Sequence, residues 1–217
     1  MTPSSVVVIC YLMGAVPYGL IVTWLFNRID LREYGSGNIG ASNVLRTSGA
    51  WAGAAVLVLD VGKGLLAVTL ARTIDHSPSL EVAAAIAVLV GHSWSVFLRL
   101  KGGKGVATSI GALWALSPLA GLLVMLVGLP FLAYFRYVSL GSIIGALTAL
   151  VSMLLLGMLG PSVPFGVPSL TYVIYTLFGT PIILLKHREN IMRLLRGQER
   201  KLGDAVIAED TSPKVSG

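Results

Sequence analysis

Charged residues are scarce in this chain: Asp, Glu, Lys and Arg make up 12% of its 217 residues, while hydrophobic residues make up 55%. A soluble domain ordinarily has about a quarter of its residues charged, so this composition excludes that class. Uncharged stretches of about 20 residues recur, and each can cross a hydrocarbon core as a helix. We therefore expect one all-α, polytopic membrane domain over residues 1–202, and a disordered cytoplasmic tail over residues 203–217.

Cysteine is almost absent as well. The single residue, Cys10, lies in the first apolar stretch, which excludes a disulfide framework and a cysteine-based metal site, and we expect no cofactor. The N-terminal stretch has no basic residues before its apolar part and no clear cleavage site, so we expect a retained helix. A net charge of +6 in such a protein mainly sets membrane orientation and argues against nucleic acid as a partner.

The apolar stretches predict the membrane spans; they cover residues 5–26, 50–71, 80–98, 106–135, 138–159 and 165–185. Basic residues cluster between them, in residues 27–49, 99–104 and 186–201. The positive-inside tendency places all three clusters on the cytoplasmic side. Two spans separate the first cluster from the second, but three stretches separate the second from the third, so one stretch must cross twice.

The stretch over residues 106–135 is the candidate, because Pro118 lies near its middle. Proline removes a backbone donor and disfavours helix in the residue before it. Splitting the stretch into residues 106–116 and 119–135 gives about seven transmembrane helices, with the N-terminus outside and the C-terminus inside. The short fourth helix would be about 16 Å long, so it must thin the membrane locally or form a re-entrant element. No internal repeat is visible.

Two glycine-rich loops are the candidate anion sites. Residues 35–40 (GSGNIG) match a dinucleotide fingerprint, but no buried strand precedes them and no βαβ unit follows. Residues 101–105 (KGGKG) lack the Ser or Thr and the upstream glycine of a P-loop. Both loops can still present backbone N–H groups to an oxyanion, and Arg46 adds a guanidinium. The alternatives are a tight turn for the first loop and a basic linker at lipid headgroups for the second.

Asp60 and Lys63 are charged residues near the middle of the second apolar stretch. They are three residues apart and can pair on one helix face. Charges at this depth are costly and normally face a bundle interior or a watery cavity. Either a buried pair that fixes helix packing or a role in ligand binding accounts for them.

The histidines do not form a recognised catalytic pair. Neither His92 nor His187 has an Asp five residues later, so the His-x4-Asp arrangement of one acyltransferase superfamily is absent. His92 is more typical of a helix end than of a base. His187 belongs to a cluster with Lys186, Arg188 and Asn190 that indicates another anion site; an interfacial amphipathic helix is the alternative.

With these residues laid out, nearly the whole chain up to residue 201 resembles the acyl-phosphate-dependent glycerol-3-phosphate acyltransferases of bacterial inner membranes. The resemblance is carried by three motifs, which are residues 35–46 (GSGNIGASNVLR), 91–108 (GHSWSVFLRLKGGKGVAT) and 187–199 (HRENIMRLLRGQE). Residues 60–64 (DVGKG) and 136–142 (RYVSLGS) also look like family features. Ser42, Ile39 and Ser95 depart from the usual Thr, Pro and Pro.

The resemblance implies acyl transfer from acyl phosphate to glycerol 3-phosphate, on the cytoplasmic face of the inner membrane, among membrane lipids. It implies that Ser36 and Arg46 are essential, that the 101–105 loop holds the glycerol phosphate, and that the third motif supports activity or integrity. We expect catalytic roles for Ser36, Arg46, Lys104, His187, Asn190 and Glu199. We expect substrate contacts from Asn38, Ser42, Asn43, Gly102, Gly103, Gly105, Thr108 and Ser142.

Physical reasoning agrees with this chemistry. Both substrates are anions and one carries an acyl chain, so the enzyme needs two phosphate cradles and an apolar slot between helices. Because the acyl phosphate is already activated, positioning and charge stabilisation suffice, and we expect the donor phosphate to take the hydroxyl proton. A transporter of phosphorylated solutes is the alternative from another class. A non-catalytic lipid-binding protein would leave the two glycine-rich loops unexplained.

Overall fold

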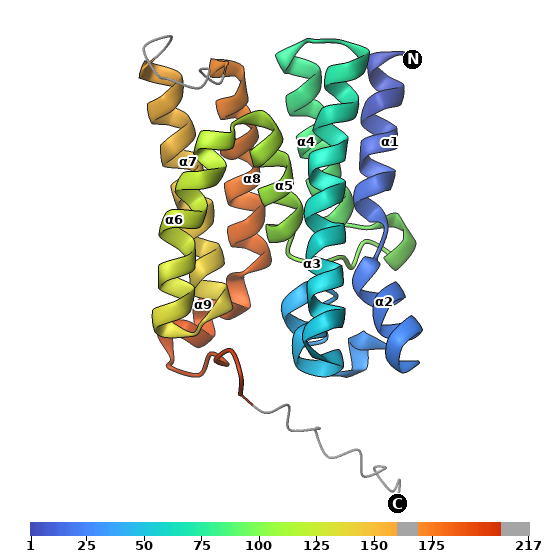
Figure 1. The fold of residues 1–217 in the computed structure, drawn as a ribbon, viewed down its shortest axis with the longest axis vertical. Helices are drawn as coiled ribbons and strands as arrows, with labels where there is room; N and C mark the ends of the chain where they lie inside the picture. Colours follow the sequence, from blue (N-terminus) through green and yellow to red (C-terminus); the bar gives the residue numbers. More distant parts are fainter. Residues whose placement is uncertain (160–168, 205–217) are drawn as a thin grey trace, which may run out of the picture.

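The computed structural model describes residues 1–159 and 169–204, and every regular element in these residues is a helix. Figure 1 shows one bundle in which the longer helices run roughly along a common axis. The α-helices are α1 (Pro3–Ala15), α2 (Tyr18–Asn27), α3 (Ala41–Ile74), α4 (Pro78–Ser93), α5 (Val106–Leu116), α6 (Pro118–Phe135), α7 (Val138–Leu159), α8 (Val173–Lys186) and α9 (Arg188–Leu195). Short 3-10 helices are η1 (Leu31–Glu33), η2 (Val96–Leu98) and η4 (Leu170–Tyr172). The expected all-α class is confirmed.

The expected count of seven membrane helices stays a prediction. Five segments of the described residues are long and apolar enough to cross a membrane; they are Pro3–Asn27, Ala41–Ile74, Pro78–Leu98, Pro118–Phe135 and Val138–Leu159. A sixth results if the pair Leu170–Lys186 and Arg188–Leu195, bent by 59°, is counted as one span. Helix α5 has only 11 residues, as expected for a short fourth helix. Residues 165–168 and 205–217, which belong to the expected last span and tail, lie outside the described residues.

Proline explains two breaks between helices. The expected split before Pro118 is confirmed, since Ser117 ends α5 and its Oγ accepts a hydrogen bond from the Ala120 N–H of α6 at 3.3 Å. The expected span over residues 5–26 corresponds to the candidate span Pro3–Asn27, but its helix is broken between α1 and α2. Pro17 has no N–H, and Val16 before it is extended, with φ −60° and ψ 119°, as the residue before proline prefers.

Helix α3 starts nine residues before the expected boundary at residue 50. Its 34 residues include Gly49 with φ 87° and ψ 176°, a conformation that glycine adopts without the cost imposed by a Cβ. The expected boundary is therefore a kink, and the residues before it form helical turns of their own. This arrangement carries Arg46 on a helix instead of a loop.

Close helix packing depends on small residues. A Cβ built on Gly64 of α3 would collide with the Thr108 carbonyl of α5, and one built on Gly111 would collide with the Val61 carbonyl. Small residues let membrane helices approach closely, so the short α5 packs directly on α3. Large apolar side chains are instead exposed on the outside of the bundle, where lipid would contact them; examples are Trp51 at 87% and Met158 at 79% exposure.

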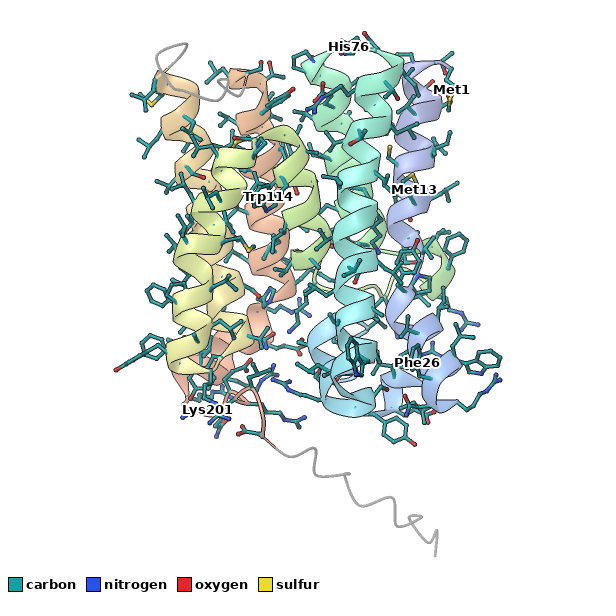
Figure 2. All side chains as sticks on the ribbon, in the orientation of Figure 1. Met1, Met13, Phe26, His76, Trp114 and Lys201 are labelled. Atoms are coloured by element: carbon teal, nitrogen blue, oxygen red, sulfur yellow. The ribbon has the colours of Figure 1, made fainter. Side chains whose placement is uncertain are left out.

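A partly buried polar cluster around the buried Glu81 anchors α5 at the end of the bundle far from its loop. The Arg72 guanidinium donates to Glu81 Oε2 at 2.6 Å and to the Ala115 carbonyl at 2.8 Å. Tyr172 donates to the same carboxylate at 2.9 Å. In Figure 2 His76 marks this end, whereas Phe26 and Lys201 lie at the opposite end. The last turn of α5 is thus tied to α3, α4 and η4.

Candidate active site

The first motif folds around the side chain of Asn43, which is completely buried. Its Nδ2 donates to the carbonyls of Tyr34 at 3.0 Å and Asn38 at 2.9 Å, and its Oδ1 accepts from the Ser36 N–H at 2.9 Å. Asn38 Oδ1 in turn accepts from the Gly40 N–H at 3.0 Å. Asn43 therefore shapes the loop from inside, while Ser36 and Asn38 lie at its surface.

The glycine-lysine loop, residues 101–105, lies between η2 and α5. Arg99 and Leu100 before it both have positive φ, at 50° and 64°, and Gly105 ends it with φ 79° as the N-cap of α5. The first turn of a helix leaves N–H groups without partners inside the helix and favours negative charge. Lys104 and the start of α5 are thus brought to the same place.

The third motif begins where α8 bends into α9. His187 is only 2% exposed, and its Nδ1 lies 2.8 Å from the Ile183 carbonyl. Because a carbonyl can only accept, Nδ1 carries the proton and the other ring nitrogen, Nε2, has the free lone pair. Asn190 follows on α9 and is buried beside it.

A chain of hydrogen bonds joins the second motif to the third. Lys104 Nζ donates to Asn190 Oδ1 at 2.5 Å, and Asn190 Nδ2 donates to Glu199 Oε1 at 2.6 Å. Glu199 also accepts from Ser139 of α7 at 2.7 Å and from Arg193 at 2.8 Å. One carboxylate therefore fixes α7, α9 and the segment after α9 relative to one another.

Burial and these hydrogen bonds set the charge states of Lys104 and Glu199. Burial of the Lys104 ammonium lowers its pKa to about 8. Burial alone would raise the pKa of Glu199. The hydrogen bonds from Ser139, Asn190 and Arg193 lower it by more, so the pKa lies below the ordinary value. At neutral pH Lys104 is largely protonated and Glu199 is ionised.

The three motifs enclose a polar cavity of about 650 Å³. Its lining includes six basic side chains, namely Arg46, Lys104, Lys186, Arg188, Arg193 and Arg200, against Asp60, Glu189 and Glu199. Two of these carboxylates are already paired, Glu199 with Arg193 and Asp60 with Lys63. Among the described residues no carboxylate lies within 4.0 Å of Arg46 or Lys104, and the buried Arg46 Nε has no hydrogen-bond partner. The cavity is suited to a phosphate-sized anion.

An apolar slot of about 560 Å³ adjoins the polar cavity and runs between α3, α5, α6, α7 and α8. Ser42, Val106, Val138 and Ser142 are among the residues that line both spaces. Deeper in, the slot is lined by Leu113, Val124, Met125, Ala149 and Tyr175. A molecule with a charged head and an apolar chain would therefore fit across the junction.

The structure brings most of the expected site residues together. All but three of the fourteen line the polar cavity, the exceptions being Asn43, Gly103 and Thr108. Thr108 is fully buried against α3 and Gly103 packs against His92. The lining residues that sequence reasoning missed include Ser139 and Arg200, although both lie beside recognised features. No three His, Cys, Asp or Glu side chains of the described residues gather closely enough to hold a metal ion.

Comparisons with known proteins identify relatives along almost the whole chain. Residues 4–197 match the family model described as glycerol-3-phosphate acyltransferase. A glycerol-3-phosphate acyltransferase of Dinoroseobacter shibae is 42% identical over 89% of this chain and 89% of its own, and one of Rubrobacter xylanophilus is 40% identical over 91% and 94%.

A solved structure shares the fold. It is the crystal structure of PlsY, an integral membrane glycerol 3-phosphate acyltransferase, in its glycerol 3-phosphate form. It superimposes with a TM-score of 0.83 at 34% identity and covers 93% of this chain and 96% of that one. Its lysophosphatidic acid form gives a TM-score of 0.81 at 33% identity, over 92% and 94%.

Proposed function

Because this chain belongs to the glycerol-3-phosphate acyltransferase family and is an integral membrane protein, we propose that it uses acyl phosphate as its donor. The products are 1-acyl-glycerol 3-phosphate (lysophosphatidic acid) and inorganic phosphate, in the first acylation of phospholipid synthesis. The observation that carries this proposal is the junction of the cationic cavity with the apolar slot. The reaction requires this pairing, since two phosphate groups and one acyl chain must meet at a single carbonyl carbon.

The basic groups of the cavity suit two phosphates better than one. Arg46 lies on the α3 side and Lys104 on the loop before α5, and neither has a carboxylate partner among the described residues. We assign Lys104 and the loop glycines to the phosphate of glycerol 3-phosphate. Arg46, Ser36 and Asn38 are assigned to the phosphate of the donor, whose chain extends into the slot past Ser42 and Ser142.

The chemistry then needs little from the protein beyond placement. The C1 hydroxyl oxygen of glycerol 3-phosphate attacks the carbonyl carbon, the bond from that carbon to the phosphate oxygen breaks, and the departing phosphate takes the hydroxyl proton. Positioned cations stabilise the charge that develops on the carbonyl and phosphate oxygens. Asn190 holds Lys104, Glu199 holds Asn190, and His187 forms part of the cavity wall.

The same arrangement favours the cytoplasmic face of a bacterial inner membrane for the site. The basic clusters of the sequence all contribute to the polar cavity, and such clusters tend to remain on the cytoplasmic side. A transporter of phosphorylated solutes would need a polar path along the membrane axis. Here the polar cavity continues into an apolar slot, which suits a lipid substrate.

The test is phosphate release by the purified protein in lipid vesicles, given palmitoyl phosphate and glycerol 3-phosphate. We expect release that requires both substrates, none with palmitoyl-coenzyme A as donor, and a loss of about a hundredfold or more in Arg46→Ala, since a buried charged contact contributes about 2–5 kcal/mol. Lysophosphatidic acid is identified by mass spectrometry.

The matched control is Arg28→Ala. Arg28 is also an arginine near a helix end, but it stacks on Trp24 at 4.1 Å and does not line the cavity, so we expect nearly normal activity. Acyl transfer from palmitoyl-coenzyme A in place of palmitoyl phosphate would overturn the donor assignment. Uptake of glycerol 3-phosphate into vesicles without any acyl transfer would favour the transporter.

A further inference from the structure

Three ionisable side chains are buried beneath the glycine-lysine loop and have no part in the proposed chemistry. Asp60 and Lys63 of α3 are 2% and 3% exposed, and His92 of α4 is 5% exposed. Lys63 Nζ lies 2.8 Å from Asp60 Oδ1, and His92 Nδ1 lies 3.6 Å from the same oxygen. Buried charges are costly and need a compensating role.

The far side of the His92 ring is in contact with the loop. A Cβ built on Gly103 would collide with His92 Nε2, and one built on Gly102 would collide with the His92 carbonyl. The Gly103 N–H donates to that carbonyl at 3.0 Å. Gly103 does not line the polar cavity, so its lack of a side chain serves contact with His92 and not approach of a phosphate.

The near side of the ring faces the ion pair, at a distance that gives an electrostatic contact and not a hydrogen bond. Lys63 holds Asp60 and also donates to the Val16 carbonyl at 3.2 Å, at the break between α1 and α2. Asp60 in turn faces Nδ1 of the ring. A continuous series of contacts therefore runs from the α1–α2 break, through Lys63, Asp60 and His92, to the residue before Lys104.

We propose that His92 is a positioning residue: its ring, held by the Asp60–Lys63 pair, is the surface on which residues 102–103 fold, and it thereby sets where Lys104 meets the phosphate of glycerol 3-phosphate. The inference rests on the proposed assignment of that phosphate to the glycine-lysine loop. It assigns Gly103 to loop shape, whereas sequence reasoning placed it in the binding cradle. His92 and Asp60 also line the polar cavity, but in this proposal His92 acts on the phosphate through the loop and not by contact.

The test is a double-mutant cycle between the ring and the glycine. The proteins are the wild type, His92→Asn, Gly103→Ala and the double variant, in lipid vesicles with both substrates. Asparagine keeps an N–H group toward Asp60 but lacks the part of the ring that faces Gly103. His92→Ala is a second version of the same cycle, and thermal unfolding reports whether each variant folds.

We expect Gly103→Ala to raise the KM for glycerol 3-phosphate by about tenfold or more, with the KM for palmitoyl phosphate within about twofold. The increase in the KM for glycerol 3-phosphate in the double variant should be smaller than the product of the two single increases. The reason is that, without the His92 ring, the added methyl group at position 103 has nothing to collide with. The glycine control is Gly62→Ala, since a Cβ there meets nothing within 4 Å. The histidine control is His76→Ala, an exposed residue in the α3–α4 link.

Two outcomes would overturn the inference. One is a KM change in the double variant equal to the product of the two single changes, which would show that the ring and the glycine act independently. The other is an equal rise in KM for both substrates, or a fall in kcat with KM unchanged. Calorimetric titration of glycerol 3-phosphate without donor repeats the cycle as dissociation constants. The coupling is therefore measured even if the wild type does not turn over acyl phosphate.

Discussion

The polar cavity and the apolar slot share α3, α5, α7 and α8, but their linings are held in place differently. In the cavity, a few side chains from segments distant in the sequence hold one another through hydrogen bonds, as Lys104, Asn190 and Glu199 do. In the slot, many small and apolar residues contribute space and contact area without specific partners. A single substitution in the cavity should therefore abolish most of the acyl transfer, whereas a substitution in the slot should change the acyl-chain preference gradually.

The largest effect expected in the cavity is from Lys104→Met. Methionine keeps most of the side-chain volume but removes the ammonium group and leaves Asn190 Oδ1 without its donor. We expect kcat/KM for glycerol 3-phosphate to fall by about a hundredfold to a thousandfold, from the loss of a buried charged contact. The measurement is phosphate release at saturating palmitoyl phosphate.

The control for this variant is Lys101→Met in the same loop. Lys101 is exposed and does not line the cavity, so we expect a change of less than about twofold, as for most surface substitutions. Equal losses in the two variants would show that loop charge in general matters and not the placement of one ammonium group.

An intermediate effect is expected in the slot from Ala149→Leu. Ala149 lies eleven residues after Val138, about 16 Å further along α7 at 1.5 Å per residue, and lines the deep part of the slot. The added carbons would displace about two methylenes of a long chain, each contributing about 0.8 kcal/mol when buried. We expect kcat/KM for palmitoyl phosphate to fall by about tenfold, and that for octanoyl phosphate to remain nearly unchanged.

The matched control is Val151→Leu, which adds a methylene on the exposed side of the same helix. It should leave the chain-length profile unchanged. If Ala149→Leu slows both donors equally, the deep part of the slot does not hold the end of the acyl chain.

The smallest effect expected is the pH dependence of the cavity. Lys104 loses its proton as the pH rises through about 8, and a neutral amine attracts phosphate less. We expect kcat/KM for glycerol 3-phosphate to fall about fourfold between pH 7 and pH 8.5, because this ratio reports groups of the free enzyme. Lys104→Arg should keep its charge and give a flat profile over this range, even at lower activity.

Stability should change in the opposite direction over the same range. Because the pKa of Lys104 in the folded protein is below its ordinary value, the unfolded chain binds more protons above pH 8, and the Lys104 contribution to stability rises with pH. Thermal unfolding followed beside activity separates the two effects. A loss of activity that accompanies unfolding, or that persists in Lys104→Arg, would contradict the assignment.

The sequence predicted the fold class and the gathering of the motifs better than it predicted the breaks in the helices. Pro118 and Pro17 have the same local effect on the residue before them, yet only Pro118 was needed to balance the positive-inside pattern, so the break at Pro17 was missed. The sequence places the start of the second apolar stretch at residue 50, directly after Gly49, because the polar turns before it do not have the apolar pattern that marks a membrane helix. Their helical form depends on packing of the buried Val44.

Individual roles within the motifs were harder to predict than the motifs themselves. Asn43, Gly103 and Thr108 are of residue types that bind phosphate, but the structure turns them toward the protein and not toward the cavity. A side chain that shapes a loop and one that touches a ligand can have the same chemistry. Only the position of neighbours in space, such as His92 beside Gly103 and the Tyr34 carbonyl beside Asn43, distinguishes them.

The contact between Arg200 and the first motif has a consequence for the order in which the protein is made. Arg200 Nη1 donates to the Gly35 carbonyl at 3.1 Å, across 165 residues of sequence. Domains generally begin to fold from their N-terminal part during synthesis, so the first and second motifs are made well before residue 199 leaves the ribosome. A nascent chain that has not reached residue 200 therefore lacks this contact, and its cavity stays incomplete until the third motif has been made.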